Sequence, residues 1–461
     1  MQKEKIRILN PSRLPDELEC HRIQVGNPGI DFKPTVTKLS DGALIMVNCH
    51  SHEEESTGYN CLLHCMMHRS HDNGQTWISQ HSFQTYGKEP YISAVNDTLF
   101  ITAHLYNFDV QNPYSKCVAY IYRSEDRGDT WQQTLVDPGQ AGYESKTPLA
   151  IKTRPEDNTF GGNHALTTRN LVCLSDGTLA MFCAYHNERC FKMTSRDDGK
   201  TWSYAPVQVK GQKDVYGLFE EGFLWVTDSG RLLCLDRCHP DKMEFSKTVP
   251  GLRYHAVAGP GDYDQLATEI LYESSDAGLT WEPIGAVPML GVMYPSVLRL
   301  GNNEYLLTFT VRVALEGNHM GVKAVFMKEM DDGRIVIQCD KDFIAVDERT
   351  PDCLATGGGF GNTIRADDGM MLTPYSYRDA DKDVRQDILT EKHHDREHYT
   401  RLHKLVGRWR QYARCDFNQF QMECEPSKRF VYVSMNGCLR KSYHVIEVAK
   451  WKLPQMATYV G

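Results

Sequence analysis

The sequence of 461 residues lacks several features that would assign it to other classes of protein. No apolar run approaches the ~18 residues that span a bilayer, so a membrane-spanning protein is not expected. The 51 basic residues are outnumbered by 60 acidic ones and form no stripe, which argues against a nucleic-acid partner. Helical periodicity is almost absent, and this leaves an all-β protein as the predicted class.

The cysteines and the first residues set expectations about the cellular compartment. The 15 cysteines are odd in number and include no C-x-x-C pair, so we expect reduced thiols buried as small apolar side chains. The opening residues, MQKEKIRILNPS, are not followed by the apolar stretch of a secretory signal. We therefore expect a cytoplasmic location, or a periplasmic or secreted one if a leader has been removed.

One octapeptide, S-x-D-x-G-x-T-W, occurs four times and takes four of the seven tryptophans. Its copies span residues 70–77, 124–131, 195–202 and 274–281. Each copy predicts a hairpin turn in which the Asp accepts backbone N–H bonds, the Gly adopts a positive φ and the Trp begins the next strand. Four copies in register with strand patterns indicate a repeated structural unit.

A second repeated pattern consists of two apolar strands joined by Asp-Gly or an equivalent turn, as in 35–47, 170–182 and 223–235. Six such hairpins recur at a mean spacing of about 66 residues. They begin near Lys33, Glu89, Asn163, Glu221, Tyr294 and Asn362. Four short antiparallel strands per unit at this period predict a β-propeller, in which radial repetition protects the sheet edges.

The predicted architecture is one β-propeller domain over residues 1–461, with seven four-stranded blades favoured and six possible. The count stays open because a charged insertion near residues 379–405 lengthens the sixth unit. N- and C-terminal strands such as 5–9 and 443–453 are expected to close the last blade together.

Residues equidistant from a hairpin turn are cross-strand neighbours, so the two strand ends of each hairpin should emerge at one rim of the central channel. Glu221 and Arg237 are symmetric about Ser229. The same rule gives five further pairs: His164 with His186, Tyr294 with Arg312, Asn362 with Arg378, Lys33 with Cys49 beside His50, and Glu89 with the neighbourhood of His104. Polar side chains at every such strand end predict a ligand site at the channel mouth.

The octapeptide, with the L-x-D-G hairpin before it, resembles the Asp-box of the sialidase superfamily over at least residues 30–380. This resemblance implies a glycosidase that cleaves a terminal, acidic sugar from an oligosaccharide or glycan, without a metal or cofactor. It also implies that Glu221 and Arg237, sixteen residues apart, are the family's Glu and second Arg. Lys33 stands where the family has the Arg of F-R-I-P, and Asn362 stands where the family has its nucleophilic Tyr.

The chain is also similar to the ulvan-lyase-like and rhamnosidase-like seven-bladed propellers. Those proteins carry two histidines in one blade, together with Tyr and Arg from later blades. His164 and His186 match the histidine pair, and Tyr294 and Arg312 match the later residues. This second resemblance implies a lyase that acts on a uronate.

Two reactions therefore remain open. In hydrolysis, Glu221 supports Tyr294 as the nucleophile, a Glu of 53–55 protonates the leaving oxygen, and arginines clamp the sugar carboxylate, namely Arg237, Arg312 and Arg378. In elimination, an arginine neutralises a uronate carboxylate, and a histidine or tyrosine transfers the α-proton, namely His164, His186 or Tyr294. Lys33, His50 and Asn362 complete the predicted substrate contacts. A third reading is a propeller that binds glycans without cleaving them.

Overall fold

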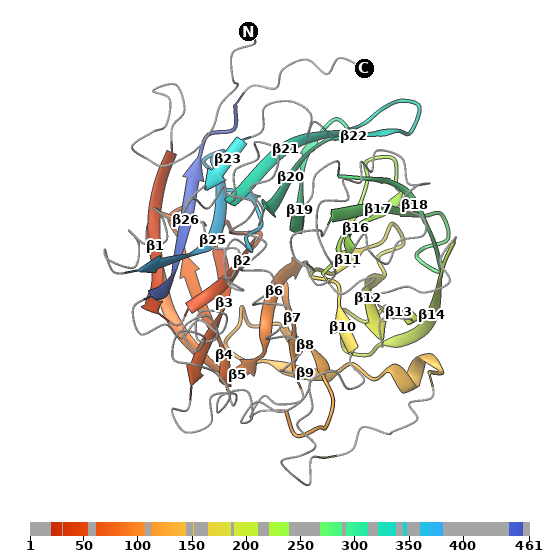
Figure 1. Cartoon of the computed structure of the whole chain (residues 1–461), viewed down its shortest axis with the longest axis horizontal. Coiled ribbons are helices and arrows are strands. Elements are labelled where there is room, and N and C mark those ends of the chain that lie inside the picture. The colour runs from red at the N-terminus through yellow and green to blue at the C-terminus, as the bar shows by residue number, and fades with distance from the viewer. Residues whose placement is uncertain are drawn as a thin grey trace, which may run out of the picture.

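Short antiparallel strands arranged in a propeller-like ring make up this fold, with β2, β6, β10 and β19 near its centre (Figure 1). The computed structural model of the chain describes residues 20–29, 31–53, 61–106, 112–143, 151, 165–185, 189–210, 221–238, 268–287, 292–311, 321–337, 344–347, 360–380 and 442–454. Helical structure in these ranges is limited to a 3₁₀ turn at Pro138–Ala141, and no described helix is long and apolar enough to cross a membrane. The predicted all-β class is confirmed.

The described strands form six antiparallel groups, called blades 1 to 6 here. Blade 1 contains β2 (Asp31–Lys38), β3 (Leu44–Glu53), β4 (Cys61–Ser70) and β5 (Ile78–Tyr86). Blade 2 contains β6 (Lys88–Val95), β7 (Thr98–Leu105), β8 (Val118–Ser124) and β9 (Gln132–Leu135). In blade 3, β10 (Ala165–Thr167) and β11 (Val172–Cys173) both pair with β12 (Leu179–Tyr185), which is followed by β13 (Arg189–Ser195) and β14 (Ser203–Val209).

The remaining blades repeat this order of strands. Blade 4 contains β15 (Phe223–Val226), β16 (Leu232–Cys238), β17 (Thr268–Ser274) and β18 (Thr280–Ala286), and β18 also pairs in parallel with β14. Blade 5 contains β19 (Val292–Gly301), β20 (Glu304–Val311) and β21 (Gly321–Glu329), with β22 (Ile335–Ile337) and β23 (Ile344–Asp347) paired to β21. Blade 6 contains β24 (Ile364–Arg365), β25 (Met371–Ala380), β26 (Ser442–Trp451) and β1 (Cys20–Gly29).

Strand sequence follows strand position within a blade. Central strands such as β12, LAMFCAY, are buried at every residue because neighbouring blades cover both faces of the sheet. The outer strand β9, QQTL, has no buried residue and carries polar side chains. The alternation of apolar and polar residues is therefore clear only where one face of a strand meets solvent.

The hydrophobic core lies between the blades. Six buried clusters each join mainly two neighbouring blades, so the packing runs continuously round the ring. In the cluster that joins blade 6 to blade 1, Leu372 and Ile446 pack with Val36 and Met46. The seven blades favoured from the sequence are thus not confirmed, and the described strands match the count of six. The length of segment 381–441 led to too high an expected number of blades. This segment adds no blade between β25 and β26, because these two strands pair directly with each other.

Blade 6 is closed by strands from both ends of the chain. β1 pairs with β26 from Cys20 opposite Trp451 onward. Arg22 of β1 donates hydrogen bonds to the Tyr375 hydroxyl and, at 2.7 Å, to a backbone carbonyl of β23. The Tyr375 hydroxyl in turn donates to Glu447 Oε2 at 2.5 Å. The N-terminal closing strand is therefore β1; the predicted strand 5–9 and the insertion 379–405 beyond Ala380 lie outside the described residues.

The octapeptides form the turns between the third and fourth strands of blades 1 to 4, with the predicted geometry. In the second copy, the Ser124 hydroxyl donates to Asp126 at 2.7 Å and accepts from Gly128 N at 2.8 Å. Asp126 also accepts from the amide and the hydroxyl of Thr130, at 2.8 and 2.5 Å. The other three copies repeat the Ser–Asp, Gly–Ser and Asp–Thr amide bonds. The repeated residues thus satisfy the turn's own polar groups.

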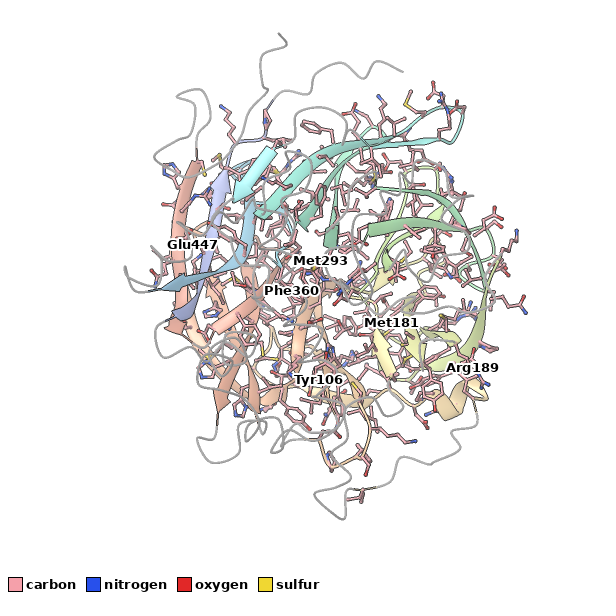
Figure 2. All side chains as sticks on the ribbon, viewed as in Figure 1. Tyr106, Met181, Arg189, Met293, Phe360 and Glu447 are labelled. Carbon is pink, nitrogen blue, oxygen red and sulfur yellow. The ribbon has the colours of Figure 1, made fainter. Side chains whose placement is uncertain are left out.

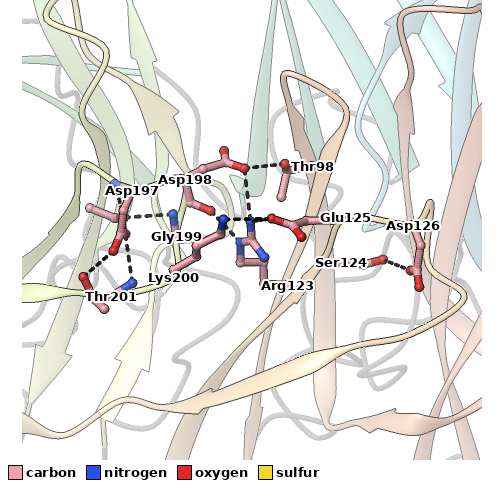
Figure 3. Close-up of polar contacts among 11 residues, drawn as sticks. Thr98, Arg123, Ser124, Glu125, Asp126, Asp197, Asp198, Gly199, Lys200 and Thr201 are labelled. Carbon is pink, nitrogen blue, oxygen red and sulfur yellow. Dashed lines mark hydrogen bonds and ion pairs between the residues drawn. The ribbon is translucent and has the colours of Figure 1, made fainter.

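Each octapeptide turn also docks on the preceding blade, as Figure 3 shows for blades 2 and 3. Arg123 Nε of blade 2 donates to the Asp198 carbonyl at 2.5 Å, and the Thr98 hydroxyl donates to Asp198 Oδ2 at 2.6 Å. Lys200 and Glu125 form an ion pair of 3.3 Å across the same junction. In the other three turns, the carbonyl that corresponds to Asp198 O accepts a bond from a basic residue of the preceding blade, namely Arg69, Lys192 or Lys450.

Eight of the cysteines in the described ranges are free thiols, and six of these eight are buried. Cys65, on β4, is one of these, and burial raises the pKa of its thiol to about 12. A protonated, enclosed thiol behaves as a small apolar side chain. The six buried thiols therefore agree with the small, packed, apolar role expected for the cysteines.

Candidate functional site

Four residues near the start of innermost strands have a left-handed backbone. Lys33, Glu89, Tyr294 and Phe360 have φ of 58°, 53°, 57° and 69°, and each precedes a Pro or a Gly. The first three lie at β-bulges, where the register of the strand pair shifts. Such a conformation costs a bulky residue about 1–2 kcal/mol, and strained residues cluster at functional sites. These positions therefore mark one end of the ring as a candidate site.

The side chains at these positions meet at the centre of the ring, where Figure 2 labels Phe360 and Met293. The Tyr294 and Phe360 rings contact edge to face, with centroids 4.2 Å apart. Lys33 Nζ lies 5.1 Å from the Phe360 ring centroid and 6.0 Å from that of Tyr294. Because these residues belong to blades 1, 5 and 6, their contacts place them on the axis.

Arg169 of blade 3 reaches the same point and was not singled out from the sequence. Its guanidinium carbon lies 4.6, 5.0 and 5.4 Å from the ring centroids of Phe360, Tyr91 and Tyr294. Nη1 donates to the Pro295 carbonyl at 3.2 Å, while Nε and Nη2 have no hydrogen-bond partner within the described ranges. The aromatic faces attract this buried cation instead, and burial lowers the pKa of Arg169. Arg169 thus packs against the rings of the candidate site and is itself buried.

Two ion pairs lie beside these rings. Arg237 Nη1 donates to Glu221 Oε2 at 2.7 Å, and both side chains are 15% exposed. Lys33 Nζ donates to Glu89 Oε1, with the two side chains 8% and 16% exposed. Burial raises the pKa of Glu221, Arg237 opposes that shift, and the charges of Glu89 and Lys33 also act on it. The two pairs are therefore neighbours, and both keep part of their surface in solvent.

A further carboxyl group lies behind Arg237. Glu269 of β17 is the direct cross-strand partner of Arg237 and is fully buried. Burial raises the pKa of Glu269 well above its ordinary value, and the charges of Asp236 and Glu221 raise it further. Sequence reasoning missed Glu269 because the strand that carries it follows residues 239–267, which show no hairpin pattern.

We call the partly exposed pairs and the two rings the axial site. Its members are Lys33, Glu89, Glu221, Arg237, Tyr294 and Phe360. Guanidinium and ammonium groups bind carboxylates, carboxyl and phenol groups transfer protons, and aromatic rings offer an apolar face. The partly exposed charged groups are thus suited to an anionic ligand, and the Tyr294 and Phe360 rings, 3% and 1% exposed, support them from the core. Glu89 was placed at the rim from the sequence without a role in binding, and Phe360 was not singled out, although the Pro or Gly that follows each of them is a usable signal.

The cross-strand rule is correct for blade 4 and fails in blades 5 and 6. In blade 4, Phe223 lies opposite Leu235, in the register that brings Glu221 to Arg237. In blade 5, Val292 lies opposite Val311, and the bulge takes Tyr294 out of the predicted pairing with Arg312. In both blades the observed centre of symmetry lies about one to two residues before the predicted one, and this small shift changes which side chains face each other.

The pairing of Asn362 with Arg378 is wrong for the same reason. Ile364 lies opposite Leu372, because the turn closes with a bond from Ala366 N to Met370 O, and Arg378 pairs with His444 of β26. The predicted facing of Lys33 and Cys49 is also displaced, since Phe32 lies opposite Cys49 and Lys33 occupies the bulge. Lys88, next to Glu89, lies opposite His104, close to the prediction.

Two predicted substrate contacts have structural partners instead. Asn362 is 5% exposed, and its amide accepts from Val36 N at 2.8 Å and donates to Val36 O at 2.7 Å, which ties blade 6 to blade 1. His50 is 3% exposed, and its Nδ1 lies 2.5 Å from Asp31 Oδ1. Neither side chain is included in the axial site. Asn170 repeats the role of Asn362 between blades 3 and 4, with two bonds of 2.8 Å to the Leu224 backbone.

Several predicted residues lie outside the described residues. They are His164, His186, Arg312 and the glutamates at 54 and 55, together with the side chains of Arg378 and Glu53. Within the described ranges, no group of three or more His, Cys, Asp or Glu side chains could hold a metal ion. Blade 3 keeps the register expected for its histidine pair up to Ala165 opposite Tyr185.

Comparison with known proteins finds likeness in structure alone: no family model and no curated sequence matches this chain. A crystal structure of a protein of unknown function from Dyadobacter fermentans aligns with a TM-score of 0.51 and 16% identity, over 78% of this chain and 93% of that chain. This likeness concerns the fold. Trypanosoma rangeli sialidase in complex with sialic acid aligns with a TM-score of 0.47 and 16% identity, over 80% of this chain and 57% of that chain.

The NanB sialidase from Streptococcus pneumoniae aligns with a TM-score of 0.48 and 11% identity, over 77% of this chain and 66% of that chain. This chain thus spans less than two thirds of the length of either sialidase.

Proposed function

We propose that this chain is a glycosidase-like enzyme that binds a terminal, carboxylate-bearing sugar of an oligosaccharide at the axial site and cleaves its glycosidic bond. The observation that carries the proposal is the Glu221–Arg237 pair, bonded at 2.7 Å and 15% exposed on each side. Its neighbours are a second ion pair and two aromatic rings, and four members of the site have strained backbones. Strain at four polar or aromatic positions of one rim supports function over packing alone.

Each group in the site has a chemical role in this proposal. Arg237 holds the sugar carboxylate through charge-assisted hydrogen bonds, and Lys33 adds positive charge beside it. Tyr294 attacks the anomeric carbon while Glu221 takes the phenolic proton, and the glycosidic C–O bond breaks as the predicted acid, a Glu of 53–55, protonates the leaving oxygen. Water then cleaves the bond between Tyr294 and the sugar, which releases the free sugar and restores the phenol. Phe360 is 1% exposed, and its ring packs against Tyr294 and holds that side chain in place. Burial raises the pKa of Glu221, and a higher pKa makes this carboxylate a better acceptor for the phenolic proton.

Product analysis tests the proposal. The protein is incubated with sialylated and uronate-containing oligosaccharides, and products are followed by mass spectrometry and ultraviolet absorbance. We expect a free, saturated acidic sugar. Glu221→Gln should lower kcat by about 10²–10⁴-fold, the usual effect of losing a proton-transfer group. Arg237→Met should weaken binding of the acidic sugar by about 10–100-fold.

A matched control is Glu282→Gln, which removes an exposed carboxylate that pairs with Lys210 on the outer strands of blades 3 and 4. Its activity should equal that of the wild type. Absorbance from an unsaturated uronate would instead indicate elimination, in which His164 and His186 are the predicted bases. Binding of acidic glycans without turnover would indicate a glycan-binding propeller.

A further inference from the structure

Glu269 is a buried carboxyl group with an unusual environment. It lies at the start of β17, opposite Arg237, and is fully buried. Neither carboxyl oxygen has a hydrogen-bond partner within the described ranges. Its backbone carbonyl accepts a hydrogen bond of 2.9 Å from Val287 N, so the backbone group, unlike the side chain, is satisfied. An ionised carboxylate in such a place is strongly unfavourable, and a neutral one is much less so.

The charges around Glu269 lead to the same conclusion. The charges of two other carboxyl groups act on it, Glu221 before β15 and Asp236 on β16, and both favour a proton on Glu269. Two guanidinium groups oppose them: Arg237 on β16 and Arg169 of blade 3. Arg237 already bonds to Glu221 at 2.7 Å, so a third ionised carboxyl would leave excess negative charge in a buried region. Burial itself is the largest cause of the raised pKa.

We propose that Glu269 holds a proton in the resting protein and that this neutral carboxyl preserves the attraction of Arg237 for an anionic ligand. Loss of the proton places a second carboxylate beside Arg237 and weakens the binding of anions. Glu269 is then a positioning residue, which acts on the ligand through Arg237 and sets an upper pH limit on binding. The inference rests on the proposed function in one respect, namely that the ligand carries a carboxylate.

The first test needs no ligand. The infrared spectrum of the wild-type protein at neutral pH should contain the C=O stretch of a buried, protonated carboxyl group. That band should be absent from Glu269→Gln, and it should fade in the wild type as the pH rises. Glutamine has the shape of the protonated carboxyl, so this variant is expected to fold. A wild-type spectrum whose carboxylic acid band is unchanged by the substitution overturns the proposal.

The second test measures binding of glucuronate and N-acetylneuraminate by calorimetry across the same pH range. If only the protonated form binds well, the wild-type Kd rises about tenfold per pH unit once the band has faded. Glu269→Gln should keep the low-pH affinity throughout. The control is Glu273→Gln, on the same strand. The Glu273 carboxylate accepts hydrogen bonds of 2.6 and 2.8 Å from Arg231, and the variant should show the same dependence of Kd on pH as the wild type.

The outcomes separate this inference from the proposed function. Binding by both proteins with the same pH dependence overturns the role of Glu269 and leaves the proposed function standing. Absence of binding by either protein overturns both. If Glu269→Gln does not fold, the wild type still decides the matter, because the band and the affinity must decline over the same pH range.

Discussion

Replacing Gly278 by alanine tests the docking of the octapeptide turns between blades. Gly278 has φ of 87°, and an added Cβ would lie 2.2 Å from Phe182 Cζ and 2.6 Å from Cε1 in blade 3. Phe182 is fully buried and contacts Trp281 edge to face at 5.1 Å, so it has no open space to move into. The left-handed backbone costs about 1–2 kcal/mol, and overpacking adds about 1–3 kcal/mol.

Gly230 provides a matched control within the same blade. Its φ is 89°, but an added Cβ would meet nothing within 4 Å. Gly230→Ala should therefore lower the free energy of unfolding by the backbone cost alone, about 1–2 kcal/mol. Urea denaturation, with unchanged m-values, should show that Gly278→Ala loses about 1–3 kcal/mol more than this control. Equal losses in the two variants would refute the docking of this turn on blade 3.

Three further changes test other parts of the fold. Tyr375→Phe removes the hydroxyl that bonds Glu447 at 2.5 Å and should cost about 1.5–3 kcal/mol in urea denaturation. Asn362→Ala removes two bonds to the backbone of blade 1 and should cost about 2–4 kcal/mol without changing the Kd for an acidic sugar. The Thr130 hydroxyl lowers the pKa of Asp126 to about 2. This carboxylate therefore adds stability above its unfolded pKa of about 3.9, and the gain is lost as the pH falls towards 2. Asp126→Asn should remove this pH-dependent part of the free energy of unfolding, measured from pH 5 to pH 2. Because Asp126 is exposed to solvent, we expect the contribution to be less than about 1 kcal/mol.

Each of these predictions can fail separately. A loss below ~0.5 kcal/mol for Tyr375→Phe would mean that this hydroxyl does not hold blade 6 together. If the Asn362→Ala variant folds but binds the sugar more weakly, Asn362 contacts the ligand, as the sequence predicted. Identical acid unfolding of the wild type and Asp126→Asn would mean that the turn carboxylate carries none of the pH dependence.

The strands and turns could be predicted because their signals are local. The octapeptide specifies its own hydrogen bonds, from Ser124 to Asp126 and from Thr130 to Asp126, within seven residues. The hairpin at 223–235 has a tight turn at its centre of symmetry, and so the pairing of Glu221 with Arg237 followed from counting alone. The number of blades could not be predicted in this way, because the length of a segment does not distinguish a blade from an insertion such as 381–441.

Contacts between blades could not be predicted from local patterns. Arg169 meets Tyr91, Tyr294 and Phe360 from three other blades, and no sequence spacing relates these residues. The bulge at Tyr294 shifts the register of its hairpin, although the Tyr-Pro step is visible in the sequence. Asn362 was taken for a ligand contact because its amide can bond to a sugar or to a backbone, and only the fold places the Val36 backbone within reach.

A crystal structure of the protein with a bound acidic monosaccharide tests the central claim most directly. We expect the sugar carboxylate within hydrogen-bond distance of Arg237, and the anomeric carbon of the sugar next to the Tyr294 hydroxyl. A sugar bound on the outer strands, or at the opposite end of the ring with Arg237 and Glu221 still paired, would contradict the assignment of the axial site.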